Sequence, residues 1–238
     1  MKLSIPFDDI KEAIELASSE HHYLIDKKNQ CIVFISDYEN DYEKKLEETD
    51  NDNFIAFQPR MPQDDINIMQ SFAYGLRDFN LAQEFDRSLK GRKPFLNFKA
   101  LLELHPELRE QWLAHRDKEI TDEAMDFLFE HDIELEDKSF MPVIEIREVK
   151  PGDVKLPDGW DTFGPVACLK CDNKKGIRTR YFELNTSPEN MLIDKEIKKI
   201  MLERYGVENY GHIGGGERDI LTISECPKCK STDIFEDF

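Results

Sequence analysis

The sequence predicts an α+β protein in two parts, and three observations predict it. Apolar residues recur at helical spacing almost without a break over residues 64–135. Two short apolar runs within residues 23–36 flank a polar tetrapeptide, which is the pattern of a β-hairpin. Residues 150–160 (KPGDVKLPDGW) are rich in proline, glycine and aspartate and predict a linker. We therefore expect a mainly helical N-terminal domain with a small β-hairpin or sheet over 1–149, and an α+β domain with an inserted helix over 161–238.

The N-terminal segment predicts one helix and a small sheet. Residues 7–19 carry an apolar stripe at helical spacing and predict an amphipathic helix. Tyr23–Asp26 and Cys31–Ser36 predict the two strands of the hairpin. Residues 37–52 are almost entirely polar and acidic, so they predict either an exposed helix or a loop. A short strand over Phe54–Phe57 follows.

The middle of the chain predicts consecutive helices. Aspartates, asparagines and prolines stand where helices begin, because their side chains or fixed φ suit the first turn. The predicted starts are Asp64 or Asp65, Asn80, Pro94, Pro106 and Thr121-Asp122-Glu123, with Gly91 as a stop. The last of these helices is expected to end near Ile133, before a strand over Met141–Val149.

The second part predicts strands around one helix. Thr162–Ala167, Ile177–Leu184 and Asp219–Ser224 have the apolar alternation of strands, and Ile234-Phe235 can close the sheet. Residues 188–205 place isoleucines and a methionine on one helical face.

Four of the five cysteines form two C-x-x-C pairs, Cys168 with Cys171 and Cys226 with Cys229, each directly after a predicted strand. Two residues between cysteines let both thiolates reach one ion, and two such pairs complete a tetrahedral site without a vacancy. The 54 intervening residues exceed the usual ribbon spacing, and the inserted strand and helix account for them. The pattern predicts a zinc-ribbon-like domain with one structural zinc ion.

Two other uses of these cysteines stay open. The same four sulfurs can hold iron or an iron–sulfur cluster. Cys226-Pro-Lys-Cys229 also has the composition of a redox dithiol, although such a thiol normally begins a helix and the residues that follow predict a turn and a strand.

Charge separates the two parts and bears on partners. The net charge is −18, and residues 1–160 hold 36 acids and 20 bases whereas residues 161–238 hold 14 and 12. An acidic surface opposes nucleic-acid binding, so we expect a protein partner. The alternative is nucleic-acid association through the ribbon, using Lys170, Lys174, Lys175, Arg178 and Arg180.

Two further segments are candidate binding sites for an anion or a partner. Lys90, Arg92, Lys93 and Lys99 form a basic island in the acidic part, although the same bases can simply offset neighbouring acids. Gly214, Gly215 and Gly216 precede Arg218 in a glycine-rich loop, residues 211–216, but a strand follows where a phosphate-binding loop needs a helix. With His212, this loop is also where an enzyme's pocket would lie.

A family resemblance covers about half of the chain. The residues that carry it are Tyr23-Leu24-Ile25-Asp26, Met69-x-x-Phe72, Leu89-Lys90-Gly91-Arg92-Lys93-Pro94-Phe95-x-x-Phe98-Lys99 and Trp112. Residues 23–135 thereby resemble an uncharacterised bacterial protein family of the UPF series, which has no assigned activity. The family pattern at the glycine is G-x-G-A-F-x-x-F, and Lys93 and Pro94 replace its small pair. The resemblance implies an α+β domain and leaves the two C-x-x-C pairs outside.

Localisation and class complete the expectations. Residues 1–6 lack the apolar segment of an export signal, no apolar run is long enough to span a bilayer, and the cysteines suit a reducing compartment. We expect a cytoplasmic, zinc-stabilised binding protein, and an enzyme with a site near the loop at residues 211–216 stays an alternative.

Overall fold

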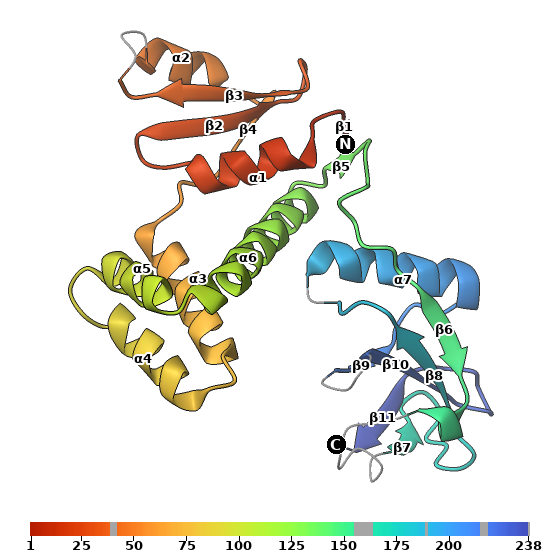
Figure 1. The fold of residues 1–238 in the computed structure, drawn as a ribbon. Coiled ribbons are helices and arrows are strands. Elements are labelled where there is room, and N and C mark those ends of the chain that lie inside the picture. Colours follow the sequence, from red (N-terminus) through yellow and green to blue (C-terminus); the bar gives the residue numbers. More distant parts are fainter. Residues whose placement is uncertain (39–41, 155–163, 189, 215–218, 238) are drawn as a thin grey trace. The chain divides into compact units, whose positions relative to one another are not determined.

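The computed structural model describes residues 1–38, 42–154, 164–188, 190–214 and 219–237. These residues form two compact units, Met1–Phe140 and Met141–Phe238 (Figure 1). Each unit combines helices with small sheets, so the predicted α+β class is confirmed. None of the helices in the described ranges combines the length and the apolar character that crossing a membrane requires.

The first unit places a small sheet before a run of helices. Its elements are β1 (Lys2–Leu3), α1 (Phe7–Leu16), β2 (His21–Asp26), β3 (Cys31–Ser36), α2 (Tyr42–Thr49), β4 (Phe54–Ala56), α3 (Pro62–Gly75), α4 (Phe79–Leu89), α5 (Pro94–Leu104), the 3-10 helix η1 (Pro106–Leu108), α6 (Arg109–Glu130) and β5 (Glu134–Leu135). β1 pairs with β5 in parallel, which joins the two ends of the unit.

The predicted hairpin is the core of an antiparallel sheet in the order β3-β2-β4. Its turn is organised by Asp26, whose carboxylate accepts the N–H groups of Lys28 and Asn29 at 2.9 Å each. The side-chain amides of Asn29 and Asn53 donate to the same carboxylate at 2.7 and 2.9 Å. Four donors to one buried aspartate fix the hairpin and tie it to the segment before β4.

The helices α3, α4 and α5 enclose an aromatic core. Phe72, Phe85 and Phe98 are buried, and Trp112 packs against them from α6. The rings meet edge to face, with centroids 5.1 Å apart for Phe85 and Phe98 and 4.8 Å apart for Phe98 and Trp112. This arrangement places the positive ring edge on the negative ring face, which adds to the burial of apolar area.

One helix prediction is wrong. The structure has a single helix, α6, of 22 residues where the sequence predicts a new helix at Thr121-Asp122-Glu123. The helix continues through residues 121–123 because no proline or glycine interrupts residues 109–130. An ion pair of 2.9 Å between Lys118 and Asp122, one turn apart, also favours it.

The second unit packs one helix on a four-stranded sheet. Its elements are β6 (Ile146–Val149), the 3-10 helix η2 (Pro151–Asp153), β7 (Gly164–Cys168), β8 (Arg178–Leu184), α7 (Met191–Tyr205), β9 (Gly211–Ile213), β10 (Asp219–Glu225) and β11 (Ile234–Asp237). One sheet has the order β6-β8-β10-β9, and β11 pairs with β7 in a second. α7 buries Ile193, Ile197 and Met201.

The second compact unit begins at Met141, and the linker that the sequence predicts covers residues 150–160. Strand β6 belongs to this unit because it pairs with β8 from Ile146↔Leu184 to Val149↔Tyr181. Of the expected linker, residues 155–160 lie outside the described residues.

Candidate metal centre

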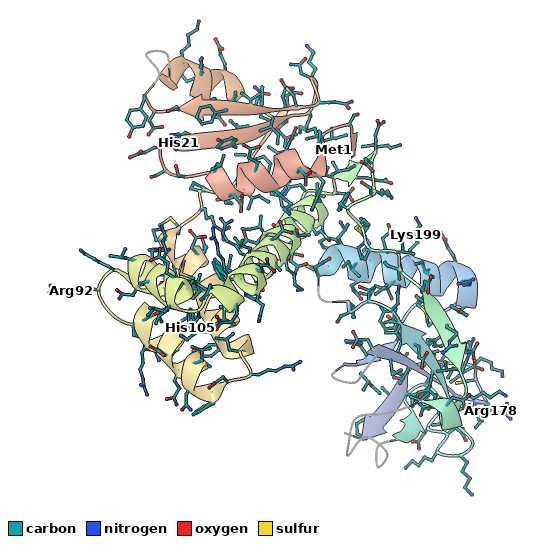
Figure 2. The ribbon with its side chains drawn as sticks, in the orientation of Figure 1. Met1, His21, Arg92, His105, Arg178 and Lys199 are labelled. Carbon is teal, nitrogen blue, oxygen red and sulfur yellow. The ribbon has the colours of Figure 1, made fainter. Side chains whose placement is uncertain are left out.

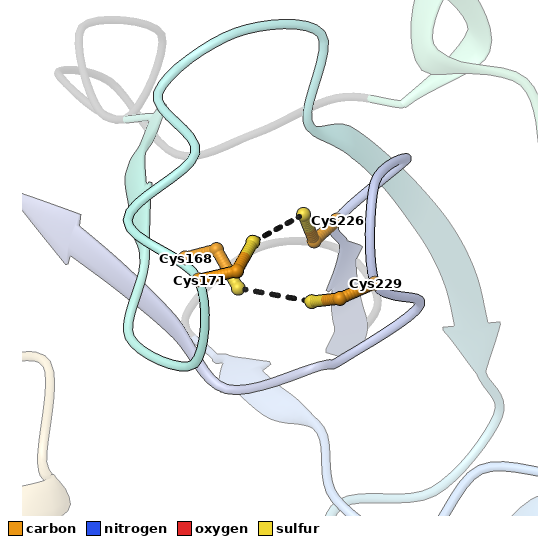
Figure 3. A group of neighbouring side chains, drawn as sticks. All are labelled: Cys168, Cys171, Cys226 and Cys229. Carbon is orange, nitrogen blue, oxygen red and sulfur yellow. Dashed lines mark hydrogen bonds between the residues drawn. The ribbon is translucent and has the colours of Figure 1, made fainter.

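Two cysteine turns meet because each connects the same two sheets. The turn at Cys168 and Cys171 leads from β7 to β8, and the turn at Cys226 and Cys229 leads from β10 to β11. β8 pairs with β10, and β11 pairs with β7, both antiparallel. Pairing at both ends brings the two turns face to face, although 54 residues separate Cys171 from Cys226 (Figure 3).

The four sulfur atoms form one compact group. All lie within 4.8 Å of one another, with 3.5 Å between the Sγ atoms of Cys168 and Cys229 and 3.6 Å between those of Cys171 and Cys226. Cys168 and Cys226 are buried, and the other two are half-buried. An ion bound about 2.3 Å from each sulfur in a tetrahedron holds the sulfurs roughly 3.8 Å apart. The donor set and its spacing therefore fit a metal ion.

The two turns share one backbone conformation. The N–H of the fifth residue donates to the carbonyl of the first cysteine, from Asp172 to Cys168 at 2.8 Å and from Lys230 to Cys226 at 2.9 Å. In both turns this fifth residue is left-handed, with φ of 54° at Asp172 and 61° at Lys230. The repeated fold explains why two unrelated sequences present their sulfurs in the same way.

The surroundings of Cys226 and Cys171 shift the pKa values of these two thiols in opposite directions. Burial alone raises the pKa of Cys226, but the N–H groups of Cys229 and Lys228 and the neighbouring thiols outweigh it and lower that pKa to about 6. At Cys171 the N–H of Asn173 acts to lower the pKa, but burial and contacts with the other three sulfurs raise it to about 12. Four adjacent thiols cannot all ionise without a cation between them. The arrangement thus favours a metal ion over four free thiolates.

The local structure does not resemble a redox dithiol. An activated C-x-x-C thiol normally takes its low pKa from the N-terminus of a helix. After Cys226, the described residues form a turn and then β11, with no helix. The two sulfur–sulfur hydrogen bonds drawn in Figure 3 each join cysteines of different turns, at 3.5 and 3.6 Å.

Basic side chains surround the centre. Lys170, Lys174, Lys175 and Arg178 are exposed. Arg178, Arg180 and Lys230 line a hollow of about 370 Å³ together with Glu225 and Pro227. Arg180 is held by Glu148 through two hydrogen bonds of 2.8 and 2.9 Å, which raise the arginine's pKa and lower that of the glutamate. Lys230 pairs with Glu225 at 3.1 Å.

The basic island of the first unit spans the turn from α4 to α5. A hydrogen bond from Lys90 to Asp86, and the proximity of that carboxylate, raise the pKa of the lysine. Arg92 projects from the turn (Figure 2), and Lys99 is exposed on α5. Lys93 precedes α5 with a left-handed φ of 59°. Phe98 is buried, whereas Phe95 is 40% exposed.

The glycine-rich segment is partly a strand. Gly211–Ile213 form β9, which pairs with β10, and Nε2 of His212 lies 3.5 Å from Oδ2 of Asp219. Gly214 is close to His212, and a Cβ there would lie 3.3 Å from the ring. Gly215, Gly216 and Arg218 fall outside the described residues.

One residue beside the sulfurs has no counterpart in the sequence analysis. Asn173 directs its side-chain amide to the sulfur of Cys226 at 3.6 Å and to the carbonyl of Lys175 at 2.8 Å. Its own carbonyl accepts the N–H of Cys168 at 2.9 Å. An amide two residues after a C-x-x-C motif is a signal that could have identified it, because such side chains often orient metal ligands.

Comparison with known proteins yields one informative relative. The chain is similar to the UPF0158 protein PA5073 of Pseudomonas aeruginosa strain PAO1, with 24% identity over 133 residues, or 56% of this chain and 86% of that protein. This similarity supports the resemblance to an uncharacterised family. No family model matches the sequence, and no solved structure matches it.

Proposed function

We propose that this protein is a binding protein whose second unit is stabilised by one zinc ion on Cys168, Cys171, Cys226 and Cys229. The observation that carries the proposal is the group of four sulfurs, each within 4.8 Å of the others and presented by two turns of the same backbone conformation. Cysteine sulfurs in a closed tetrahedral set suit zinc and leave no position for an activated water. A structural role follows from that chemistry.

The ion would stabilise the end of the second unit that holds the two cysteine turns. Two short strands, β7 and β11, hold the far side of the cysteine turns with only four paired positions. Two metal–sulfur bonds from each turn would close this end, and binding energy at a structural zinc site is folding energy. The surfaces of both units would then be available for a partner.

The test is the metal content of the purified full chain. We expect one equivalent of zinc by elemental analysis, and retention of that zinc in a Cys31→Ser variant, because Cys31 is exposed and lies in the other unit. A Cys168→Ser variant should lose most of it. Substitution by Co²⁺ should give the absorption of a tetrahedral thiolate site. Iron in the purified protein would show that the site holds iron and not zinc. Protein without metal, in which Cys226 and Cys229 reversibly form a disulfide, would support the redox alternative.

A second candidate function is association with nucleic acid through the bases beside the cysteine turns. The observation that favours it is the hollow lined by Arg178, Arg180 and Lys230. The side chain of Arg178 is exposed at this hollow. A phosphate would be a charge partner for it, and electrostatic binding of this kind weakens steeply with salt.

Binding of a single-stranded oligonucleotide at several salt concentrations tests this candidate. Replacing Lys174, Lys175 and Arg178 together by alanine should reduce the salt slope by about two units, since each phosphate contact contributes roughly 0.7 on a single strand. The matched control replaces Lys90, Arg92 and Lys99 in the first unit. Equal loss in both variants, or no binding at low salt, would reject the candidate.

A further inference from the structure

The hairpin of the first unit carries four linked aromatic rings at its surface. His21, Tyr23, Phe34 and Tyr38 form this aromatic face, and Figure 2 marks His21 on β2. Tyr23 lies directly across from Phe34, with ring centroids 5.0 Å apart. His21 lies 5.7 Å from Phe34 and 6.4 Å from Tyr38. Phe34 is 46% exposed and Tyr38 is 74% exposed, so the rings offer a continuous apolar surface.

The aromatic face adjoins the outer strand of the sheet, β3, which α2 also contacts. β3 is the outer strand of the order β3-β2-β4 in the described chain. Asp37 donates its N–H to the carbonyl of Glu20 at 3.0 Å, and antiparallel ladders alternate inward and outward groups. The outward N–H and C=O groups of β3 therefore belong to Ile32, Phe34 and Ser36. The strand sequence CIVFIS holds no charged residue and no proline, the devices that usually block an edge.

Carboxylates surround these rings. Tyr38 donates its hydroxyl to Oε2 of Glu20 at 2.7 Å. That hydrogen bond, and the charges of Glu20 and Asp37, raise the pKa of Tyr38. Burial and the charge of Glu12 raise the pKa of Tyr23. His22 contacts Asp37 at 2.9 Å from the opposite side of the strand. The negative charge and the ring faces both attract cations.

We propose that the outer edge of β3 and the aromatic face bind an extended, lysine- or arginine-rich segment of a protein partner as an added strand. The inference rests on the proposed function as a binding protein and names the class of partner. Main-chain hydrogen bonds to Ile32, Phe34 and Ser36 align the segment, as in other cases of strand addition. Alternate basic side chains then lie over Phe34 and Tyr23, within reach of Glu20. Carboxylates at this site repel phosphate, which opposes nucleic acid here.

Two synthetic octapeptides provide the test on the full chain. One alternates lysine with valine, and the other alternates glutamate with valine. We expect the basic peptide to shift the backbone amide resonances of Ile32, Phe34 and Ser36 at concentrations below about 1 mM, and the acidic peptide to leave them unchanged. Absence of these shifts with the basic peptide, or equal shifts with the acidic one, overturns the proposal. Shifts at the same amides with a single-stranded oligonucleotide in place of the basic peptide also overturn it.

Three variants separate the contribution of the aromatic ring from that of the carboxylate and from a general loss of an exposed phenylalanine. Phe34→Ala should weaken the basic peptide by about tenfold and Glu20→Gln by about threefold, since a cation–π contact and one rim charge have those sizes. Phe79→Ala, which removes a phenylalanine 72% exposed on α4, should leave the affinity unchanged. Equal effects of Phe34→Ala and Phe79→Ala overturn the proposal. Zinc content is measured on the same samples, so that failure of this inference can be told from failure of the proposed function. Protein that contains zinc but does not bind the peptide refutes only this inference.

Discussion

Asp26 shows how a single residue determines the geometry of a whole hairpin. Its carboxylate is the common acceptor for two backbone N–H groups and two side-chain amides. The N–H of Asn29 is the main cause that lowers the pKa of Asp26 below its ordinary value of 3.8, burial opposes it, and the amides of Asn53 and Asn29 add to the lowering. The ionised form is therefore favoured by folding.

The first prediction concerns Asp26 and pH. A carboxyl with a lowered folded pKa contributes stability that is present above its unfolded pKa and is lost as the pH falls through the folded pKa. Asp26→Asn should speed hydrogen exchange of the β2 and β3 amides at pH 5–7. The asparagine side chain has only one acceptor oxygen, and its NH₂ group would point at N–H groups that now donate to the carboxylate. The difference from the native chain should shrink below pH 3.8. An unchanged difference down to pH 2 would contradict this account.

The second prediction concerns Asn173, which contacts the sulfur of Cys226. Asn173→Ala removes a donor that softens the charge of a ligand, while the four sulfurs remain. Metal affinity, measured by competition with a chelator, should fall roughly 10–100-fold, the usual effect of an outer-sphere change. Asn185→Ala is the control, since Asn185 makes comparable hydrogen bonds far from the cysteines in the chain. Equal metal affinities in both variants would show that Asn173 does not support metal binding.

At the scale of elements, helix starts depend on backbone conformation as well as on side-chain caps. α5 begins after Lys93, whose left-handed φ of 59° suits glycine. The family pattern that this segment resembles has glycine at the same position. Here the chain has lysine, so the turn between α4 and α5 is formed at a cost in conformational energy.

The third prediction follows from this cost. Lys93→Gly should stabilise the first unit by about 1 kcal/mol, the lower end of the penalty for a side chain in the left-handed region. Lys99→Gly, inside α5, should destabilise it by about 1 kcal/mol, because glycine is a poor helix former. Chemical denaturation of both variants measures the two effects. Two changes of the same sign would show that the backbone at Lys93 is not strained.

At the scale of the whole molecule, the chain divides into a unit with a metal-binding group and a unit without one in the described residues. The aromatic core of Phe72, Phe85 and Phe98 stabilises the first unit through buried apolar area and ring contacts, without a metal. Under the proposed function, the cysteine turns of the second unit depend on a bound zinc ion. The two units should therefore respond differently to loss of metal.

The fourth prediction tests this division by limited proteolysis. With zinc chelated, cleavage should concentrate in residues 161–238 while a fragment near residues 1–140 survives, because the loss of a structural metal is large beside a typical stability of about 5–15 kcal/mol. Cys229→Ser should reproduce the pattern without chelator, and Cys31→Ser should not. Uniform resistance after chelation would mean that the second unit is stable without metal.

The sequence by itself determined the elements whose signal is local. The hairpin strands, the helix over residues 188–205 and the cysteine pairs follow from periodicity and spacing, which neighbouring residues impose on each other directly. The single helix α6 was missed because capping residues at 121–123 are equally compatible with a helix interior.

Only the tertiary structure decided what distant segments form together. Strand β6 belongs to the second sheet because β8 offers it a partner, and no local pattern encodes that pairing. The four sulfurs meet because β8 pairs with β10 and β7 with β11, between segments far apart in the chain. The aromatic face and the outward backbone groups of β3 likewise exist only once the register of β2 and β3 is set. Periodicity carries information over one turn or one strand, whereas strand order and register depend on packing across the whole unit.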